Sequence, residues 1–273
     1  MKPITSFIKR YPQGVFWGIA WLTFAFGWYM VKTQSSELWQ LLIWGSFLGG
    51  ALVTGIADGR NGLKIYFSRI VRWRVGIQWY AVALLLPLLL RLVAFGLNIV
   101  SGAKILPDIQ WPSFGDLLAD FLIILLVIAL GEEPGFRGFA LPRLMAGRTA
   151  LMASLILGVL HTIWHAPVFI TGDDPFITTT LIIISGAILN TWLFNNTNGS
   201  VFMAMFLHAS VNLWGDVFRP VFSEADSMRQ EVWLAVAFVA MAILLPILTG
   251  RDLGRKPEAS MDTLPAEQPA MAS

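Results

Sequence analysis

Long apolar stretches separated by short polar segments dominate this sequence. About 20 apolar residues in a helix cross the hydrocarbon core of a bilayer. Backbone polar groups in lipid must be satisfied within the segment, so each such stretch is expected to be helical. The pattern therefore predicts eight transmembrane helices, at roughly residues 14–31, 38–56, 76–99, 116–131, 151–170, 178–195, 201–218 and 231–249.

The composition supports this interpretation. Of the 273 residues, 56% are hydrophobic and only 13% are charged, whereas a soluble domain carries about 25% charged residues. We therefore predict an all-α, polytopic membrane helix bundle. Residues 1–250 would form one membrane domain, with the chemistry in a core at 116–218. Residues 251–273 are rich in Pro, Ala, Glu and Ser, which predicts a disordered cytoplasmic tail.

The distribution of Lys and Arg predicts the topology. With the N-terminus inside, fourteen of the nineteen basic residues fall in inside segments and four in outside segments. Such a bias places both termini in the cytoplasm. The basic, aromatic-containing loop 57–74 would either lie on the anionic inner leaflet or act only as a topology anchor. Nothing in this pattern indicates a nucleic-acid partner.

Two adjacent acidic residues, Glu132 and Glu133, end one of the apolar runs. Ionised side chains at membrane depth cost roughly 2.5–3.5 kcal/mol each on insertion scales, so they are usually functional. Glu133 and Arg137 are spaced i, i+4 and can pair on one helix face. The following Pro134 and Gly135 predict a helix break that turns a carboxylate toward the bundle interior, where it could serve as general base and then general acid.

The alternative for this cluster is structural. The whole segment could be an ordinary cytoplasmic helix end, with Arg143 and Arg148 acting as positive anchors on the inside.

The chain's three histidines all belong to polar pairs spaced i, i+4: His161 with His165, and His208 with Asn212. The first pair could hold a proton or a metal, although Thr162 stands where a typical metalloprotease helix has Glu. The second pair could donate hydrogen bonds to an oxyanion. Each pair could instead only join helices through hydrogen bonds.

Taken together, three apolar helices each present a polar pair. Polar faces turn away from lipid, so the pairs are expected to converge on one cavity. The chain has no cysteine, which excludes disulfides, thiolate ligands and cysteine nucleophiles.

Other polar positions are less informative. Arg91 could reach the membrane surface or pair with a buried carboxylate. Asp173 and Asp174 are predicted to be solvated in an outside loop. Four asparagines are predicted to mark a short turn near the inner end of the sixth helix, namely Asn190, Asn195, Asn196 and Asn198.

In this order and spacing, Glu-Glu-x-x-x-Arg, a late helical His and His-x-x-x-Asn resemble the CPBP family of intramembrane proteases, also called the ABI family. That family includes type II CAAX prenyl endopeptidases and bacteriocin self-immunity proteins. Residues 132–144 resemble its first motif, and the likeness extends over about 117–215. His165 matches the second motif, Phe-x-x-x-His, whereas His161 occupies the position of its Phe.

The resemblance implies an intramembrane endopeptidase that cleaves membrane-associated or membrane-embedded peptides or proteins. Glu132 would activate water with His165, and Glu133 with Arg137 would support it. His208 and Asn212 would form the oxyanion site, which leaves His161 as a secondary candidate.

Family names also describe these enzymes as metalloproteases. We favour a metal-free reaction with no cofactor, over zinc held by Glu132, His165 and His208. The host membrane would be a bacterial cytoplasmic membrane. The main alternative is a non-catalytic immunity or scaffold protein, and a transporter is disfavoured because no internal repeat is evident.

Overall fold

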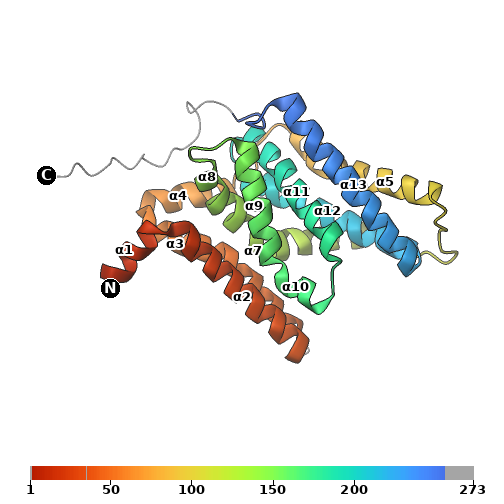
Figure 1. The fold of residues 1–273 in the computed structure, drawn as a ribbon, viewed down its shortest axis with the longest axis horizontal. Helices are drawn as coiled ribbons and strands as arrows, with labels where there is room; N and C mark the ends of the chain where they lie inside the picture. The colour runs from red at the N-terminus through yellow and green to blue at the C-terminus, as the bar shows by residue number, and fades with distance from the viewer. Residues whose placement is uncertain (1, 35, 256–273) are drawn as a thin grey trace.

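The computed structural model describes residues 2–34 and 36–255, and these residues fold almost entirely into helices (Figure 1). No strand occurs among them, and the one isolated bridge joins Ile105 to Phe222. The elements are α1 (Lys2–Arg10), α2 (Pro12–Gln34), η1 (Glu37–Trp44), α3 (Gly45–Ala57), α4 (Gly59–Ile70), α5 (Ile77–Val100), α6 (Phe114–Ile123), η2 (Ile124–Ala129), α7 (Leu130–Glu133), η3 (Pro134–Ala140), α8 (Leu141–Met145), α9 (Ala150–Trp164), α10 (Ala166–Thr171), α11 (Phe176–Asn196), α12 (Val201–Phe218), η4 (Arg219–Val221) and α13 (Glu224–Thr249).

Seven helical stretches within the described residues are long and apolar enough to cross a membrane. The predicted all-α polytopic bundle is therefore confirmed, and the chain is an integral, multi-pass membrane protein. The seven stretches are Pro12–Gln34, Leu38–Ala57, Ile77–Val100, Phe114–Met145, Phe176–Asn196, Val201–Val221 and Glu224–Thr249.

The predicted helix at 151–170 differs from the others. It is divided into α9, which has only 15 residues, and the short α10. The division falls at His165, two residues before Pro167. Proline has no backbone N–H to donate to the preceding turn. The helix α9 therefore ends before Pro167, and the chain bends before α10 begins.

Contacts between helix ends join segments that the charge pattern predicts to lie on the same side of the membrane. On one side, Arg143 bonds Asp58, and Arg255 Nη1 donates to the Met145 carbonyl at 3.1 Å. On the other side, Lys32 pairs with Asp173 at 2.5 Å. Within the described residues, seven stretches are long enough to cross a membrane, and α9 is a shorter apolar helix that α10 continues. Which end faces the cytoplasm stays a prediction.

The first residues of the predicted C-terminal tail are packed against the helix bundle. Leu253 is fully buried, and Asn195 Nδ2 donates to the Asp252 carbonyl at 3.2 Å. Residues 251–255 are thus packed against α11, because this turn satisfies buried amides there. The remainder of the predicted tail, 256–273, lies outside the described residues.

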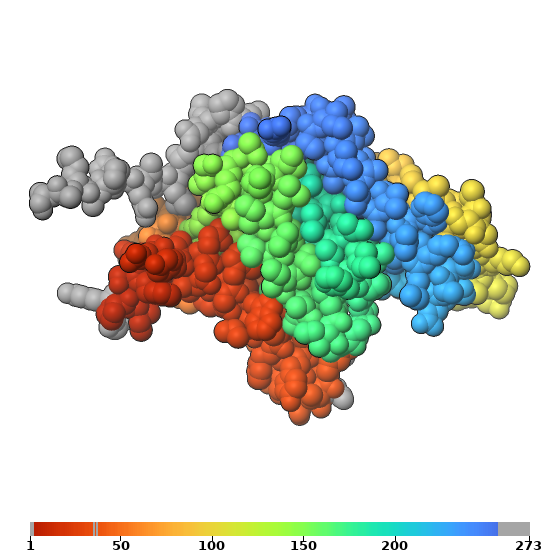
Figure 2. Space-filling view, in the orientation of Figure 1, coloured from red at the N-terminus to blue at the C-terminus, as the bar shows by residue number. Residues whose placement is uncertain are grey.

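The helices form two groups joined by the stretch Phe114–Met145. In Figure 1, α2 lies beside η1 and α3 at one side, while α5, α11, α12 and α13 pack together at the other. Between them, α9 packs against α11 and α8. Figure 2 shows the segments from α9 to α11 (green to teal) at the surface between the red α2 and the blue α13. Every residue from 131 to 141 is buried.

This central stretch does not break after the carboxylate pair, contrary to the prediction. The whole stretch is 32 residues long and includes two π-helical segments, η2 and η3, which flank the short α7. Pro134 does disturb the α-helical hydrogen-bond ladder. The chain responds by widening into π turns, a geometry that often occurs at functional sites, and so keeps both glutamates inside the bundle.

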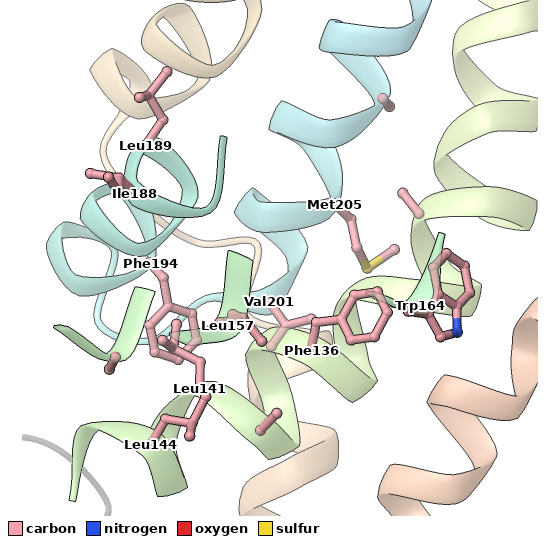
Figure 3. Packing of buried hydrophobic residues seen from close by; sticks show 14 of the residues in the cluster. Phe136, Leu141, Leu144, Leu157, Trp164, Ile188, Leu189, Phe194, Val201 and Met205 are labelled. Atoms are coloured by element: carbon pink, nitrogen blue, oxygen red, sulfur yellow. The ribbon is translucent and has the colours of Figure 1, made fainter. Parts of the chain in front are cut away.

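Large side chains fix the position of η3. Figure 3 shows Phe136 between Val201 and Trp164, close to Met205. The rings of Phe136 and Trp164 meet edge to face with centroids 5.4 Å apart, a favourable geometry for aromatic pairs. This core therefore holds the segment carrying the glutamates against α9 and α12.

On its opposite side, η3 contacts α3 through Gly135. A Cβ added at Gly135 would lie 2.5 Å from the Ser46 carbonyl oxygen. That separation is too short for any side chain, so only glycine permits the two backbones to approach this closely.

We predict that Gly135→Ala destabilises the protein by about 1–3 kcal/mol, because α3 and η3 must separate to accommodate the methyl group. Thermal unfolding in detergent should show a clearly lower Tm. Gly96→Ala in α5 is the matched control, since nothing lies within 4 Å of its Cβ position. Equal Tm values for the two variants would contradict the proposed close contact.

Candidate active site

All seven sequence-predicted site residues line one cavity of about 540 Å³. They come from three parts of the chain: the α7–η3 segment, the end of α9 and the middle of α12. The predicted convergence is therefore present in the structure. The residues are Glu132, Glu133, Arg137, His161, His165, His208 and Asn212.

Glu133 is the most heavily bonded of these residues and is only 1% exposed. Its Oε1 lies 2.9 Å from Arg137 Nη1 and 2.9 Å from His208 Nδ1. Its Oε2 lies 3.5 Å from Asn190 Nδ2. A buried carboxylate is tolerated when such donors surround it. Glu133 therefore ties its own helix to α11 and α12.

Glu132 is almost as buried, at 4% exposed, but its surroundings are different. Its Oε2 has no hydrogen-bond partner, and the nearest basic group, His161 Nε2, lies 3.5 Å away. Glu132 also lines the cavity. Of the two carboxylates, it is the one with an oxygen available to bind a ligand or take a proton.

His165 stands at the junction of α9 and α10. Its Nδ1 lies 3.2 Å from the carbonyl oxygen of His161. A carbonyl only accepts hydrogen bonds, so Nδ1 carries the proton and Nε2 of the neutral ring is left with a lone pair. Because His165 lines the cavity, it offers a second proton acceptor there.

His161 is buried beside these groups, with its ring centroid 4.9 Å from that of His165 and 4.4 Å from that of Phe136. Its Nε2 has no hydrogen-bond partner. His161, which replaces the Phe of the family motif, is thus the imidazole next to Glu132. It belongs to the lining of the cavity.

His208 links two other groups. Its Nδ1–H donates to Glu133, so its Nε2 accepts from Asn212 Nδ2 at 3.3 Å. Asn212 retains a second amide hydrogen for another acceptor. The i, i+4 pair is therefore present as predicted.

Sequence reasoning missed Asn190. The sequence predicts a turn there, but Asn190 is a buried residue of α11, opposite Glu133. The available signal was its position inside an apolar run, five residues before Asn195. A polar side chain at that depth is seldom without a partner.

Arg91 is the partner of a carboxylate, one of its two predicted roles, because it pairs with Glu231 at 2.7 Å.

Asp174 is predicted to be solvated, but it is half-buried and lines the cavity with Asp216 and Arg219. Burial raises the pKa of the Asp174 carboxyl above its ordinary value, and the Arg219 guanidinium opposes this rise. The lining of the cavity therefore includes these charged residues.

In the part of the chain that the structure describes, the side chains suggested as zinc ligands are not gathered as a zinc site requires. Zinc needs three or four ligands at about 2.0–2.3 Å from one point. Among the residues that the structure describes, no group of three or more His, Cys, Asp or Glu side chains could hold a metal ion. The three candidate ligands from the sequence are instead split, because His208 is engaged by Glu133 and Asn212.

Comparisons with known proteins agree with the motifs. Residues 114–214 match the family described as type II CAAX prenyl endopeptidase Rce1-like. The chain is also 27% identical, over 214 residues, to CAAX prenyl protease 2 of Methanococcus maripaludis. This alignment covers 71% of the chain and 78% of the relative. Residues 114–214 of the chain therefore resemble the core of the CAAX protease family. The predicted family resemblance is confirmed over this part of the chain, and it supports an enzyme.

We predict that Arg137→Met destabilises the protein by about 3–5 kcal/mol, since it leaves the buried Glu133 without its cation. Thermal unfolding in detergent should reveal the loss. Lys32→Met is the control, because it removes an exposed pair with Asp173 worth about 0–1 kcal/mol. An Arg137→Met protein as stable as the control variant would refute the role given to this ion pair.

Proposed function

We propose that the protein is an intramembrane endopeptidase that hydrolyses a peptide bond with a water molecule activated by Glu132. The observation that carries this proposal is the difference between the two carboxylates. Glu133 is occupied by Arg137, His208 and Asn190, whereas Glu132 keeps a buried oxygen without a partner beside the cavity.

In the proposed reaction, a water lies between Glu132 and Nε2 of His165. Glu132 takes one proton from the water, and the oxygen attacks the carbonyl carbon of the scissile bond. When the carbon–nitrogen bond breaks, Glu132 returns that proton to the leaving amine. The same carboxylate thus acts first as general base and then as general acid.

The tetrahedral oxyanion would be stabilised by the free amide hydrogen of Asn212. His208, whose Nε2 accepts from Asn212 Nδ2, would hold that amide in place within the oxyanion site. Removing one oxyanion donor commonly lowers the rate about 100- to 1000-fold. His161, beside Glu132, would help to hold the carboxylate in position.

The cavity suits a substrate with an apolar segment. Its lining includes the apolar residues Phe24, Trp28, Ile43 and Ile128, together with the charged residues Asp174, Asp216 and Arg219. Its volume lies within the range of about 300–1,000 Å³ typical of ligand sites. The substrate class would be a membrane-associated or membrane-embedded polypeptide. A prenylated CAAX tail is one candidate, by analogy with the name of the Methanococcus relative.

The competing function is a non-catalytic immunity or scaffold protein in which the polar pairs only hold helices together. Side chains kept for that purpose would satisfy one another. Glu132 Oε2 and His161 Nε2 instead lie 3.5 Å apart at a cavity, buried and without a hydrogen bond, an arrangement that is costly unless a ligand bonds to them.

We predict that Glu132→Gln abolishes cleavage, by at least about 1000-fold, while Tm changes little, because the amide fits the site but cannot accept the proton. Comparative proteomics of membranes carrying wild-type or variant protein should show one uncut polypeptide accumulating with the variant. The matched control is Glu224→Gln, at an exposed position of α13. Cleavage by Glu132→Gln at the wild-type rate would exclude Glu132 as the general base, whereas no cleavage by the wild type would favour the scaffold function.

We also predict that hydrolysis does not depend on a metal. The purified protein should keep its activity after dialysis against a strong zinc chelator, because the proposed chemistry uses only its own side chains. Loss of activity that returns on addition of zinc would overturn the metal-free mechanism.

A further inference from the structure

Asn190 has a polar atom that the proposed reaction does not use. The residue is 4% exposed and lines the cavity. Its Nδ2 lies 3.5 Å from both Glu133 Oε2 and the Ala204 carbonyl oxygen. Its Oδ1 is buried and has no partner. One end of the amide is therefore held, and the other is not.

The orientation of this amide is fixed by chemistry. The Ala204 carbonyl and the Glu133 carboxylate are both acceptors, so the NH₂ group must face them. The carbonyl oxygen then points away from them and can only accept. A buried acceptor without a donor is costly, and an incoming ligand could supply the missing hydrogen.

A peptide substrate carries such a donor at every residue. Its main-chain N–H groups lose water on entering the cavity and need acceptors there. Among the described lining residues, the buried atoms without partners are Glu132 Oε2, Arg137 Nε, His161 Nε2 and Asn190 Oδ1. Glu132 is committed to water in the proposed mechanism, and Arg137 Nε is a donor. Asn190 offers the only neutral carbonyl acceptor in that group.

We propose that Asn190 is a substrate-binding residue whose Oδ1 accepts a hydrogen bond from a main-chain N–H beside the scissile bond. This inference rests on the proposed peptidase function. It adds a hydrogen bond that fixes the position of the peptide main chain along the cavity. Through Nδ2, the same side chain also positions Glu133. The two ends of one amide thus couple substrate alignment to the carboxylate that holds His208.

The test uses a farnesylated, fluorophore-labelled CAAX peptide and matched analogues. In each analogue, one peptide bond next to the scissile bond is replaced by an ester, which removes a single N–H and keeps the shape. Values of kcat and KM are measured for wild type and Asn190→Leu. Asn195→Leu is the control, since Asn195 is a buried asparagine of the same helix that contacts the Asp252 carbonyl and not the cavity.

For the wild type, we expect one ester position to lower kcat/KM by about 10-fold, the effect of one lost hydrogen bond. Asn190→Leu should lose about 10-fold on the amide peptide and then discriminate less than about 2-fold between amide and ester. Asn195→Leu should keep the wild-type discrimination. An unchanged amide-to-ester ratio in Asn190→Leu would overturn the proposal and leave Asn190 only a positioning residue for Glu133.

If Asn190→Leu does not fold, Asn190→Ala decides the question, because the smaller side chain removes the same acceptor and introduces no new bulk. Reduced discrimination supports the proposal, and unchanged discrimination contradicts it.

A binding measurement separates this proposal from the peptidase function. Fluorescence polarisation with the Glu132→Gln protein reports affinity for the amide and ester peptides without cleavage. Asn190-dependent binding with no cleavage by wild type would refute the peptidase alone. Cleavage that depends on Glu132 but not on Asn190 would refute the Asn190 contact alone. Neither binding nor cleavage by wild type would refute both.

Discussion

The structure depends on neutralising one carboxylate inside a membrane protein. Glu133 is almost completely buried, and an isolated charge there would be prohibitively costly. Arg137 reaches it from the same helix, His208 from α12 and Asn190 from α11. Breaking such a set leaves an uncompensated charge, so these contacts fix how three elements meet.

That constraint also explains how two adjacent glutamates can take different roles. They are neighbours in sequence, so their side chains leave the helix in different directions. One direction leads to the Arg–His–Asn donors and the other to the cavity beside His161. The π-helical segments on either side of α7 keep both glutamates within the bundle. The two residues are of the same type, so their different surroundings explain why Glu133 is held by donors and Glu132 is available at the cavity.

Most of the architecture could be predicted from the sequence, because hydropathy and charge are strong signals in lipid. The order of the helices and the pairing of Glu133 with Arg137 follow from spacing alone. The continuous helix through Pro134 could not be predicted, since π turns depend on packing against α3 and α9 as much as on local propensity. The contact between Asn190 and Glu133 could not be predicted for a similar reason, because the two residues lie 57 positions apart in the chain.

The central claim is that Glu132 acts on water and does not itself attack the substrate. The most direct measurement is a single turnover in ¹⁸O-labelled water, with enzyme in excess over the peptide. The account predicts one ¹⁸O atom in the new carboxylate of the product and none in Glu132, as read by mass spectrometry. Unlabelled product together with ¹⁸O in Glu132 would reveal a covalent acyl-enzyme intermediate and contradict the account.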